Sequence, residues 1–426
     1  MIFGLSLIPI IFLTGMAMDF TSAAQKRIRL NAAADAAALA SVTPAMMLQS
    51  DTAAVTAATN MFNAEAANLG AATVNPPVIT LSNAGLVRTV TVSYTATSTN
   101  TFPNVFSYVT GSSHTTWPLS GTATATSYSA PNINFYLLLD DSPSMNIAAT
   151  TAGINTMVAN TSSQGGCAFA CHESDPAADD LGNPKGEDNY TLAQNLGVVT
   201  RVENMATATS ALMTTAGDTE VANDATYQMA IYTFDYNGLN TIYAPSNLPS
   251  SNLTAAATAA NTINVLEVYS NNWLTKTNQN NDADTNFETA MTAVNKLMPN
   301  PGTGASNSTP QEVLFIVSDG VDDEVNSTTC SQPLSGTRCQ EPFNTAMCTT
   351  VKNRGIMIAV LYTEYLPLPT NSWYNTWISP FESTLASNIQ SCASPGLYFE
   401  ITTDGDITAA METLFQLAIA TARLSQ

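Results

Sequence analysis

Five short apolar segments between residues 133 and 401 constrain the fold of this 426-residue chain more than any other feature. Between them lie stretches in which apolar residues recur at helical spacing. Continuous apolar strands that alternate with helices are typical of a mostly parallel sheet covered on both faces. We therefore predict a doubly wound α/β domain over residues 131–426, with an insertion at 150–188. The five segments read INFYLLL, YQMAIYTF, VLFIVS, IMIAVLYT and LYFEI.

Oxygen-bearing side chains follow two of these segments. Asp140, Ser142 and Ser144 stand at alternate positions in LLLDDSPSM, and Asp319 comes directly after VLFIVS. Ligands of such sheets bind at the carboxyl ends of the strands, where a buried carboxylate without a partner is costly. A further hydroxyl, that of Thr285, stands at the start of an amphipathic helix. Because hard divalent cations prefer oxygen ligands, we expect these five side chains to bind one.

The DxSxS motif at 140–144, the threonine at 285 and the SDG motif at 318–320 resemble the metal-ion-dependent adhesion site of a von Willebrand factor type A domain. The resemblance implies a site for Mg²⁺ or Mn²⁺, in which an acidic residue of a partner protein completes the coordination. Pro143 and Asp284 depart from the family, because many members have glycine there. The implied ligands are Asp140, Ser142, Ser144, Thr285 and Asp319.

Two expectations accompany this resemblance. The alternative for the five ligand positions is a degenerate site that keeps the fold and binds no metal. The acidic run Asp322, Asp323 and Glu324 follows closely, and we expect it to be a solvated loop rather than an outer shell of the metal site.

The N-terminal segment IFGLSLIPIIFLTGMAM, residues 2–18, holds no charge. At roughly 1.5 Å per residue it is just long enough for a short membrane span. We predict a retained anchor at residues 1–22, and the alternative is a cleaved signal sequence. The basic cluster Lys26, Arg27 and Arg29 would hold the following chain in the cytoplasm by the positive-inside rule, which conflicts with export.

Two further segments separate the anchor from the α/β domain. Residues 23–70 are rich in alanine, with no glycine before Gly70 and one proline, which predicts a long helix that continues from the anchor. Residues 71–130 alternate threonine, valine and tyrosine at period two, as in RTVTVSYTATS, which predicts a small β-rich module.

The N-terminal sequence IFGLSLIPIIFLTGMAMDFTSAAQKRIRLNAAADAAALA resembles the anchor and helix of TadG-like proteins of tight-adherence (Flp) pilus assembly. Members of that family join a pilin-like N-terminal segment to a periplasmic von Willebrand factor type A domain. The resemblance implies an inner-membrane protein whose bulk is periplasmic, with pilin-like or pilus-assembly partners. The closing segments LASNIQSCASPGLYFEI and METLFQLAIATARLSQ are also similar to the end of that family.

Six cysteines are present: Cys167, Cys171, Cys330, Cys339, Cys348 and Cys392. In an exported protein disulfides are the default expectation. We expect a local disulfide between Cys167 and Cys171. The other four allow three pairings, of which one joins Cys348 to Cys392 and leaves Cys330 with Cys339. The motif CAFACH at 167–172 has one residue too many for covalent haem, and a zinc site there would need a fourth ligand.

Net charge and side-chain inventory limit the possible functions. The formal net charge of −21 argues against nucleic acid as a partner. The sequence offers no nucleophile with a base, no phosphate-binding loop and only two histidines, so we do not expect an enzyme.

The leading hypothesis is a membrane-anchored accessory protein of Flp pilus assembly that binds a protein partner through Mg²⁺. Alternatives are a surface adhesin that uses the same metal for a host or matrix ligand, and a redox protein that uses the CAFACH insertion.

Overall fold

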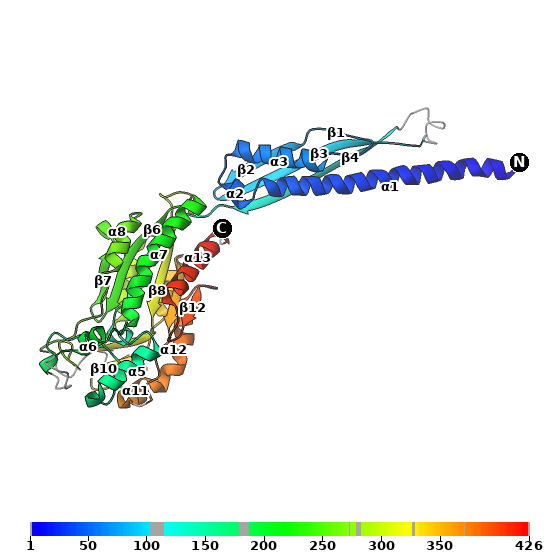
Figure 1. Cartoon of the computed structure of the whole chain (residues 1–426). Coiled ribbons are helices and arrows are strands. Elements are labelled where there is room, and N and C mark those ends of the chain that lie inside the picture. The colour runs from blue at the N-terminus through cyan, green and yellow to red at the C-terminus, as the bar shows by residue number, and fades with distance from the viewer. Residues whose placement is uncertain are drawn as a thin grey trace. The chain divides into compact units, whose positions relative to one another are not determined.

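The computed structural model describes residues 2–102, 115–178, 187–271, 273–277, 283–325, 329–369 and 371–424 (Figure 1). The predicted insertion at 150–188 lies partly outside these ranges, and so does His114. The chain divides into two compact units, Met1–Ser129 and Ala130–Gln426.

Within its described residues, the first unit packs three helices on a four-stranded antiparallel sheet. Its helices are α1 (Ile2–Ala40), α2 (Pro44–Met47) and α3 (Asp51–Glu65). In the sheet, the long strand β3 pairs with β1 and β2 and also with β4. Small alanines of α1 and α3 pack against Val90, Val92 and Tyr94 of β3, so helices and sheet share one core. The strands are β1 (Ala72–Val74), β2 (Val78–Ala84), β3 (Val87–Thr99) and β4 (Thr116–Tyr128).

The alanine-rich segment forms three helices where we predicted one. α1 ends at Ala40, and Thr43 caps α2, whose first residue is Pro44. Proline has no N–H to donate and disfavours a helical residue before it, so the helix restarts there. Ser50 then caps α3 by accepting a hydrogen bond from the Ala53 N–H. Within the described residues, no helix meets both the length and the apolarity that a membrane crossing requires.

Two charged side chains of α1, those of Lys26 and Asp19, form hydrogen bonds within the first unit. The Lys26 ammonium group donates hydrogen bonds to the Ala71 carbonyl and the Ser98 hydroxyl, both at 2.9 Å. Asp19, just after the uncharged N-terminal run, accepts the backbone N–H groups of Thr101 and Phe102 at 2.9 and 3.0 Å. Both charged groups therefore fasten α1 to the end of the β3 strand.

The second unit is built on a six-stranded mixed sheet of order β12-β11-β8-β5-β6-β7. The five apolar segments form β5, β6, β8, β11 and β12, and each pairs in parallel with its neighbour in the sheet. Only β7, at the edge, runs antiparallel among these six strands. Their bounds are β5 (Ile133–Asp140), β6 (Tyr227–Asp235), β7 (Gly238–Tyr243), β8 (Gln311–Ser318), β11 (Met357–Thr363) and β12 (Tyr398–Ile401).

Helices cover both faces of this sheet, and each face has its own core. On one face, residues of α7, α8 and α13 pack against Phe135 and Phe315. On the other face, residues of α9, α10 and α12 pack against Tyr136 and Leu314. Figure 1 shows α7 and α13 running side by side over the first face. Their bounds are α7 (Arg201–Asn223), α8 (Leu253–Ala260), α9 (Phe287–Leu297), α10 (Ala346–Asn353), α12 (Ser379–Cys392) and α13 (Ile407–Leu424).

Smaller elements surround the carboxyl ends of the parallel strands. A two-stranded antiparallel sheet joins β9 (Val321–Val325) to β10 (Arg338–Pro342). The helices there are α5 (Thr151–Asn160), α6 (Asn189–Asn195) and α11 (Ser372–Trp377). Short 3-10 helices lie at Pro143–Met145, Ser162–Gln164, Pro176–Ala178 and Pro245–Asn247.

Candidate metal centre

The two predicted carboxylate ligands lie at the ends of neighbouring strands. Asp140 is the last residue of β5, and Asp319 directly follows the last residue of β8. Because β5 and β8 are paired in parallel, both carboxylates lie at the same edge of the sheet. Both side chains are completely buried.

Hydroxyl and amide groups hold the Asp140 carboxylate from two sides. Its Oδ1 accepts the Ser142 N–H at 3.1 Å and the Ser142 hydroxyl at 2.6 Å. Its Oδ2 accepts the Ser318 hydroxyl at 2.5 Å. Ser318 also accepts the N–H of Gly320 at 3.0 Å, which fixes the direction of its hydroxyl. The Asp140 carboxylate is thus oriented by contacts from both strands.

Asp319 keeps one oxygen open. Its Oδ1 accepts the Val321 N–H at 3.2 Å, whereas its Oδ2 is buried and has no hydrogen-bond partner among the described residues. The Ser144 hydroxyl lies close to this carboxyl and lies 3.2 Å from the Ser142 hydroxyl. A buried carboxylate oxygen without a donor is costly unless a cation meets it. The donor set around it consists of carboxylate and hydroxyl oxygens, which suits Mg²⁺ or Mn²⁺.

Burial controls the charge of the two carboxyls. Burial, and then the charge of Asp319, raise the pKa of Asp140 to about 8, against the lowering effect of its hydrogen bonds. Burial also raises the pKa of Asp319, and the Ser144 hydroxyl, the Val321 N–H and the Arg201 guanidinium oppose this in that order. Arg201 is itself buried, and it donates to the Glu364 carbonyl at 2.7 Å and to the Thr403 hydroxyl at 3.2 Å. A divalent cation would let both carboxyls ionise.

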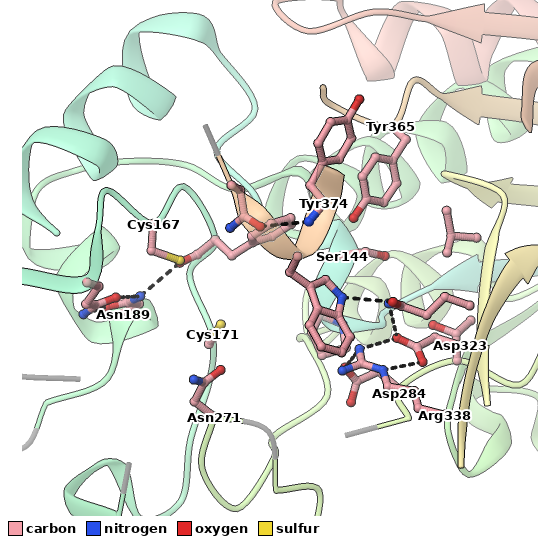
Figure 2. Close-up of a pocket in the computed structure, with 18 of the residues that line it drawn as sticks. Ser144, Cys167, Cys171, Asn189, Asn271, Asp284, Asp323, Arg338, Tyr365 and Tyr374 are labelled. Carbon is pink, nitrogen blue, oxygen red and sulfur yellow. Dashed lines mark hydrogen bonds and ion pairs between the residues drawn. The ribbon is translucent and has the colours of Figure 1, made fainter. Parts of the chain in front are cut away.

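Ser144 and Thr285 line a cavity of about 400 Å³ (Figure 2). Thr285 precedes α9 and exchanges backbone hydrogen bonds with Asp323 of β9, at 2.9 and 3.1 Å. Hydrogen bonds therefore join Asp140, Ser142 and Ser144, and the Ser144 hydroxyl lies close to the Asp319 carboxyl. The structure places Thr285 on the wall of the same cavity.

The acidic run after Asp319 is not a solvated loop. It lies in β9, and Asp322 and Asp323 are only 3% and 6% exposed. Asp322 accepts the Phe287 N–H at 3.0 Å. Asp323 accepts hydrogen bonds from Arg338, one of them at 2.7 Å, and from Gln340 at 3.0 Å. The prediction was wrong because the residues that bind these carboxylates lie far along the chain.

The cysteines give a mixed outcome. Disulfides join Cys330 to Cys339 and Cys348 to Cys392. The expected disulfide between Cys167 and Cys171 is not formed. Between them, Phe169 forms an isolated bridge to Ile147, and the Ala170 N–H donates to the Asn146 carbonyl at 2.8 Å.

His172 is not oriented toward a cofactor shared with the two cysteines. Its Nδ1 lies 2.9 Å from Asp188 Oδ2, and its ring packs on Tyr190 at 4.7 Å between centroids. The hydrogen bond with Asp188 raises the pKa of His172. Figure 2 shows Cys167 directed at Asn189 rather than at Cys171. The contacts therefore give no support to a haem or zinc site in CAFACH.

Comparison with known proteins points to the N-terminal helix. Residues 1–47 match the model of a family described as "Putative Flp pilus-assembly TadE/G-like". This match links α1 with Flp pilus assembly and suggests association with the cell envelope. No protein with a curated description matches the chain.

Three solved structures show remote similarity. The pilus adhesin SpaC from Lactobacillus rhamnosus GG has 10% identity and a TM-score of 0.33, over 82% of this chain and 35% of that chain. The PilB minor pilin from Streptococcus sanguinis has 10% identity and a TM-score of 0.35, over 83% of this chain and 78% of that chain. Proximal thread matrix protein 1 from the mussel byssus has 11% identity and a TM-score of 0.34, over 68% of this chain and 48% of that chain. The chain thus spans about a third of SpaC and about half of the mussel protein.

Proposed function

We propose that this protein is a membrane-anchored accessory protein of Flp pilus assembly, with residues 1–22 as the anchor and the bulk of the chain in the periplasm. The family match over residues 1–47 supports the connection with the pilus. Pilin-like or other pilus-assembly proteins are the partners of α1. Cell fractionation tests the location, because the protein should remain with the inner membrane and resist protease added to intact cells.

The second unit acts in this proposal as a von Willebrand factor type A domain that binds a protein partner through Mg²⁺ or Mn²⁺. The ion supplies a positive centre that an acidic residue of the partner can complete. The observation that carries this proposal is the pair of completely buried carboxylates at the ends of β5 and β8, one with an open oxygen. The residues that would hold the ion are Asp140, Ser142, Ser144, Thr285 and Asp319.

Thermal unfolding of the full chain tests the metal site. A cation that binds only the folded protein must raise its unfolding temperature. We expect Mg²⁺ and Mn²⁺ to raise it relative to chelator, and Asp319→Ala to remove this shift. Asp406→Ala, which alters a carboxylate that caps α13 instead, is the matched control and should keep the shift. An equal shift in Asp319→Ala would show that the site has been assigned to the wrong residues.

A further inference from the structure

The cavity beside the predicted metal site has a mixed lining. Ser144 and Thr285 contribute hydroxyl groups to it, and Tyr365, Trp373 and Tyr374 contribute aromatic rings. Figure 2 shows Tyr365 and Tyr374 close together on the side of the cavity away from Asn271. The remaining predicted ligands, Asp140, Ser142 and Asp319, are completely buried. A ligand of the metal that occupies this cavity therefore lies among hydroxyl groups and aromatic rings.

The aromatic rings are held in place before any ligand arrives. The Trp373 indole N–H donates to the Gln340 side-chain carbonyl at 2.9 Å. The Arg338 guanidinium lies 5.0 Å from the centroid of the Trp373 ring. Tyr374 stacks on Tyr365 with 6.4 Å between centroids and 12° between planes. Rings fixed in this way lose little conformational entropy on binding, so they form a ready platform for another flat group.

The charged side chains around the cavity limit which further ligand groups it can bind. Arg338 lines the cavity, but it pairs with Asp323 and lies 3.7 Å from Asp284. These two carboxylates balance its charge. Among the described lining residues, the cavity therefore offers no other cation that could bind a second acidic group beside the metal. The volume of about 400 Å³ lies at the lower end of the range for small ligand sites. It suits a pair of side chains rather than a folded surface.

We propose that the partner of this site presents a single carboxylate together with an aromatic side chain two residues away. The proposal rests on the proposed metal site: the carboxylate binds the metal, and the aromatic ring packs against Trp373. In an extended peptide, side chains two positions apart point the same way and lie roughly 7 Å apart, so both can enter one cavity. Neighbouring side chains point to opposite sides, so an adjacent aromatic residue cannot enter with the carboxylate.

Four peptides with acetylated N-termini and amidated C-termini test this spacing by isothermal titration calorimetry with the full chain and Mg²⁺. They are Gly-Asp-Gly-Trp-Gly, Gly-Asp-Trp-Gly-Gly, Gly-Asp-Gly-Gly-Gly and Gly-Asn-Gly-Trp-Gly. We expect the first to bind roughly tenfold more tightly than the second and third, which is the upper range for an aromatic pair. The asparagine peptide should not bind, and chelator should abolish all binding.

Variants of two tryptophans identify the platform. Trp373→Ala should remove the difference between the aromatic and glycine peptides, whereas Trp373→Phe should keep most of it. Trp273→Ala is the matched control, since Trp273 stacks on Tyr269 and does not line the cavity, and it should keep the difference.

Equal affinity for all three aspartate peptides, or no binding of any of them, would overturn the proposed partner chemistry. If Mg²⁺ still raises the unfolding temperature in that case, the metal site stands and only the aromatic subsite is wrong. If Mg²⁺ has no effect on unfolding, the metal site itself is wrong.

Discussion

At the scale of single residues, the Asp140 carboxylate depends on a neighbour that is not a predicted metal ligand. The Ser318 hydroxyl donates to Asp140 Oδ2, although the two residues are 178 positions apart in sequence. Partners that orient a metal ligand typically contribute about 10- to 100-fold in metal affinity. Ser318 is therefore a positioning residue for the proposed site.

Replacing this hydroxyl should weaken metal binding without abolishing it. We expect Ser318→Ala to raise the Mg²⁺ concentration that gives half of the full thermal shift by about tenfold. Ser308→Ala, an exposed serine in the loop before β8, is the control and should leave it unchanged. A tenfold rise in this Mg²⁺ concentration in both variants, or in neither, would contradict a positioning role.

A second buried carboxyl gives a pH-dependent prediction that does not involve the metal. Glu312 of β8 faces Asn134 of β5, which donates to it at 3.0 Å. Burial raises the pKa of Glu312 from 4.5 to about 8. The folded state therefore holds this proton more tightly than the unfolded state. The stability from this group is complete below pH 4.5 and is lost as the pH rises through about 8.

Glu312→Gln removes the ionisation while keeping a similar shape. We expect the variant to be more stable than the parent at pH 9, by more than about 1 kcal/mol, because each tenfold change in proton affinity is worth about 1.4 kcal/mol. The difference should shrink or reverse at pH 5. Urea unfolding at both pH values measures it, with exposed Glu65→Gln as the control. A difference that does not depend on pH would contradict the buried-acid account.

At the scale of elements, two disulfides connect segments of the second unit, and one of them lies in the core beneath α10 and α12. Cys348 of α10 pairs with Cys392 at the end of α12, and the two are 44 positions apart. The pair Cys330 and Cys339 closes a separation of only 9 positions. By loop-closure entropy the longer loop should contribute about 4 kcal/mol and the shorter one about 3.

Removing the bridges one at a time tests this order. We expect the double serine variant at positions 348 and 392 to lose more free energy of unfolding than the one at 330 and 339. Both Cys348 and Cys392 are completely buried, so lost packing adds to the effect. Urea unfolding of the three proteins measures the difference. A larger loss from the shorter loop would contradict this account.

The strands illustrate which elements the sequence could predict. β5 and β8 are buried over their full length, and such strands appear as continuous apolar runs. β9 and β10 read VDDEV and RCQEP, and neither run is apolar. They pair because Arg338 and Gln340 of β10 bind Asp323 of β9, a contact that no local pattern indicates.

The residues of the candidate site differ in the same way: a local pattern indicates some of them, and only tertiary contacts reveal the others. The motif residues Asp140, Ser142, Ser144 and Asp319 stand at strand ends, where sequence and topology together point to a site. The sequence patterns did not indicate Ser318, Arg201 or the aromatic residues that line the cavity. The contacts of these residues join distant parts of the chain. Pro44 was the one visible signal that the alanine-rich segment would not form a single helix.

At the scale of the whole molecule, the chain consists of two compact units with separate cores. Gly121 of β4 lies against α1 in the first unit: a Cβ there would lie 2.5 Å from Asn31 Oδ1 and 2.6 Å from a Tyr94 ring carbon. A larger side chain must push these neighbours apart, at a typical cost of about 1–3 kcal/mol.

Gly121→Val should therefore destabilise the first unit alone. We expect its calorimetric unfolding to begin at a lower temperature, while the Mg²⁺-dependent shift of the second unit is unchanged. Ser120→Val, the exposed neighbour on β4, is the control and should have little effect. If Gly121→Val also removes the Mg²⁺ response, the two units do not behave as separate folding bodies.

In the proposed function, the ends of β5 and β8 form one divalent-cation site. Titration of the full chain with Mn²⁺, measured by the loss of the free-ion signal in electron paramagnetic resonance, tests this. We expect one tightly bound Mn²⁺ per chain that excess Mg²⁺ displaces, and none in Asp319→Ala. One bound Mn²⁺ in Asp319→Ala, or none in the parent protein, would show that these residues do not form the site.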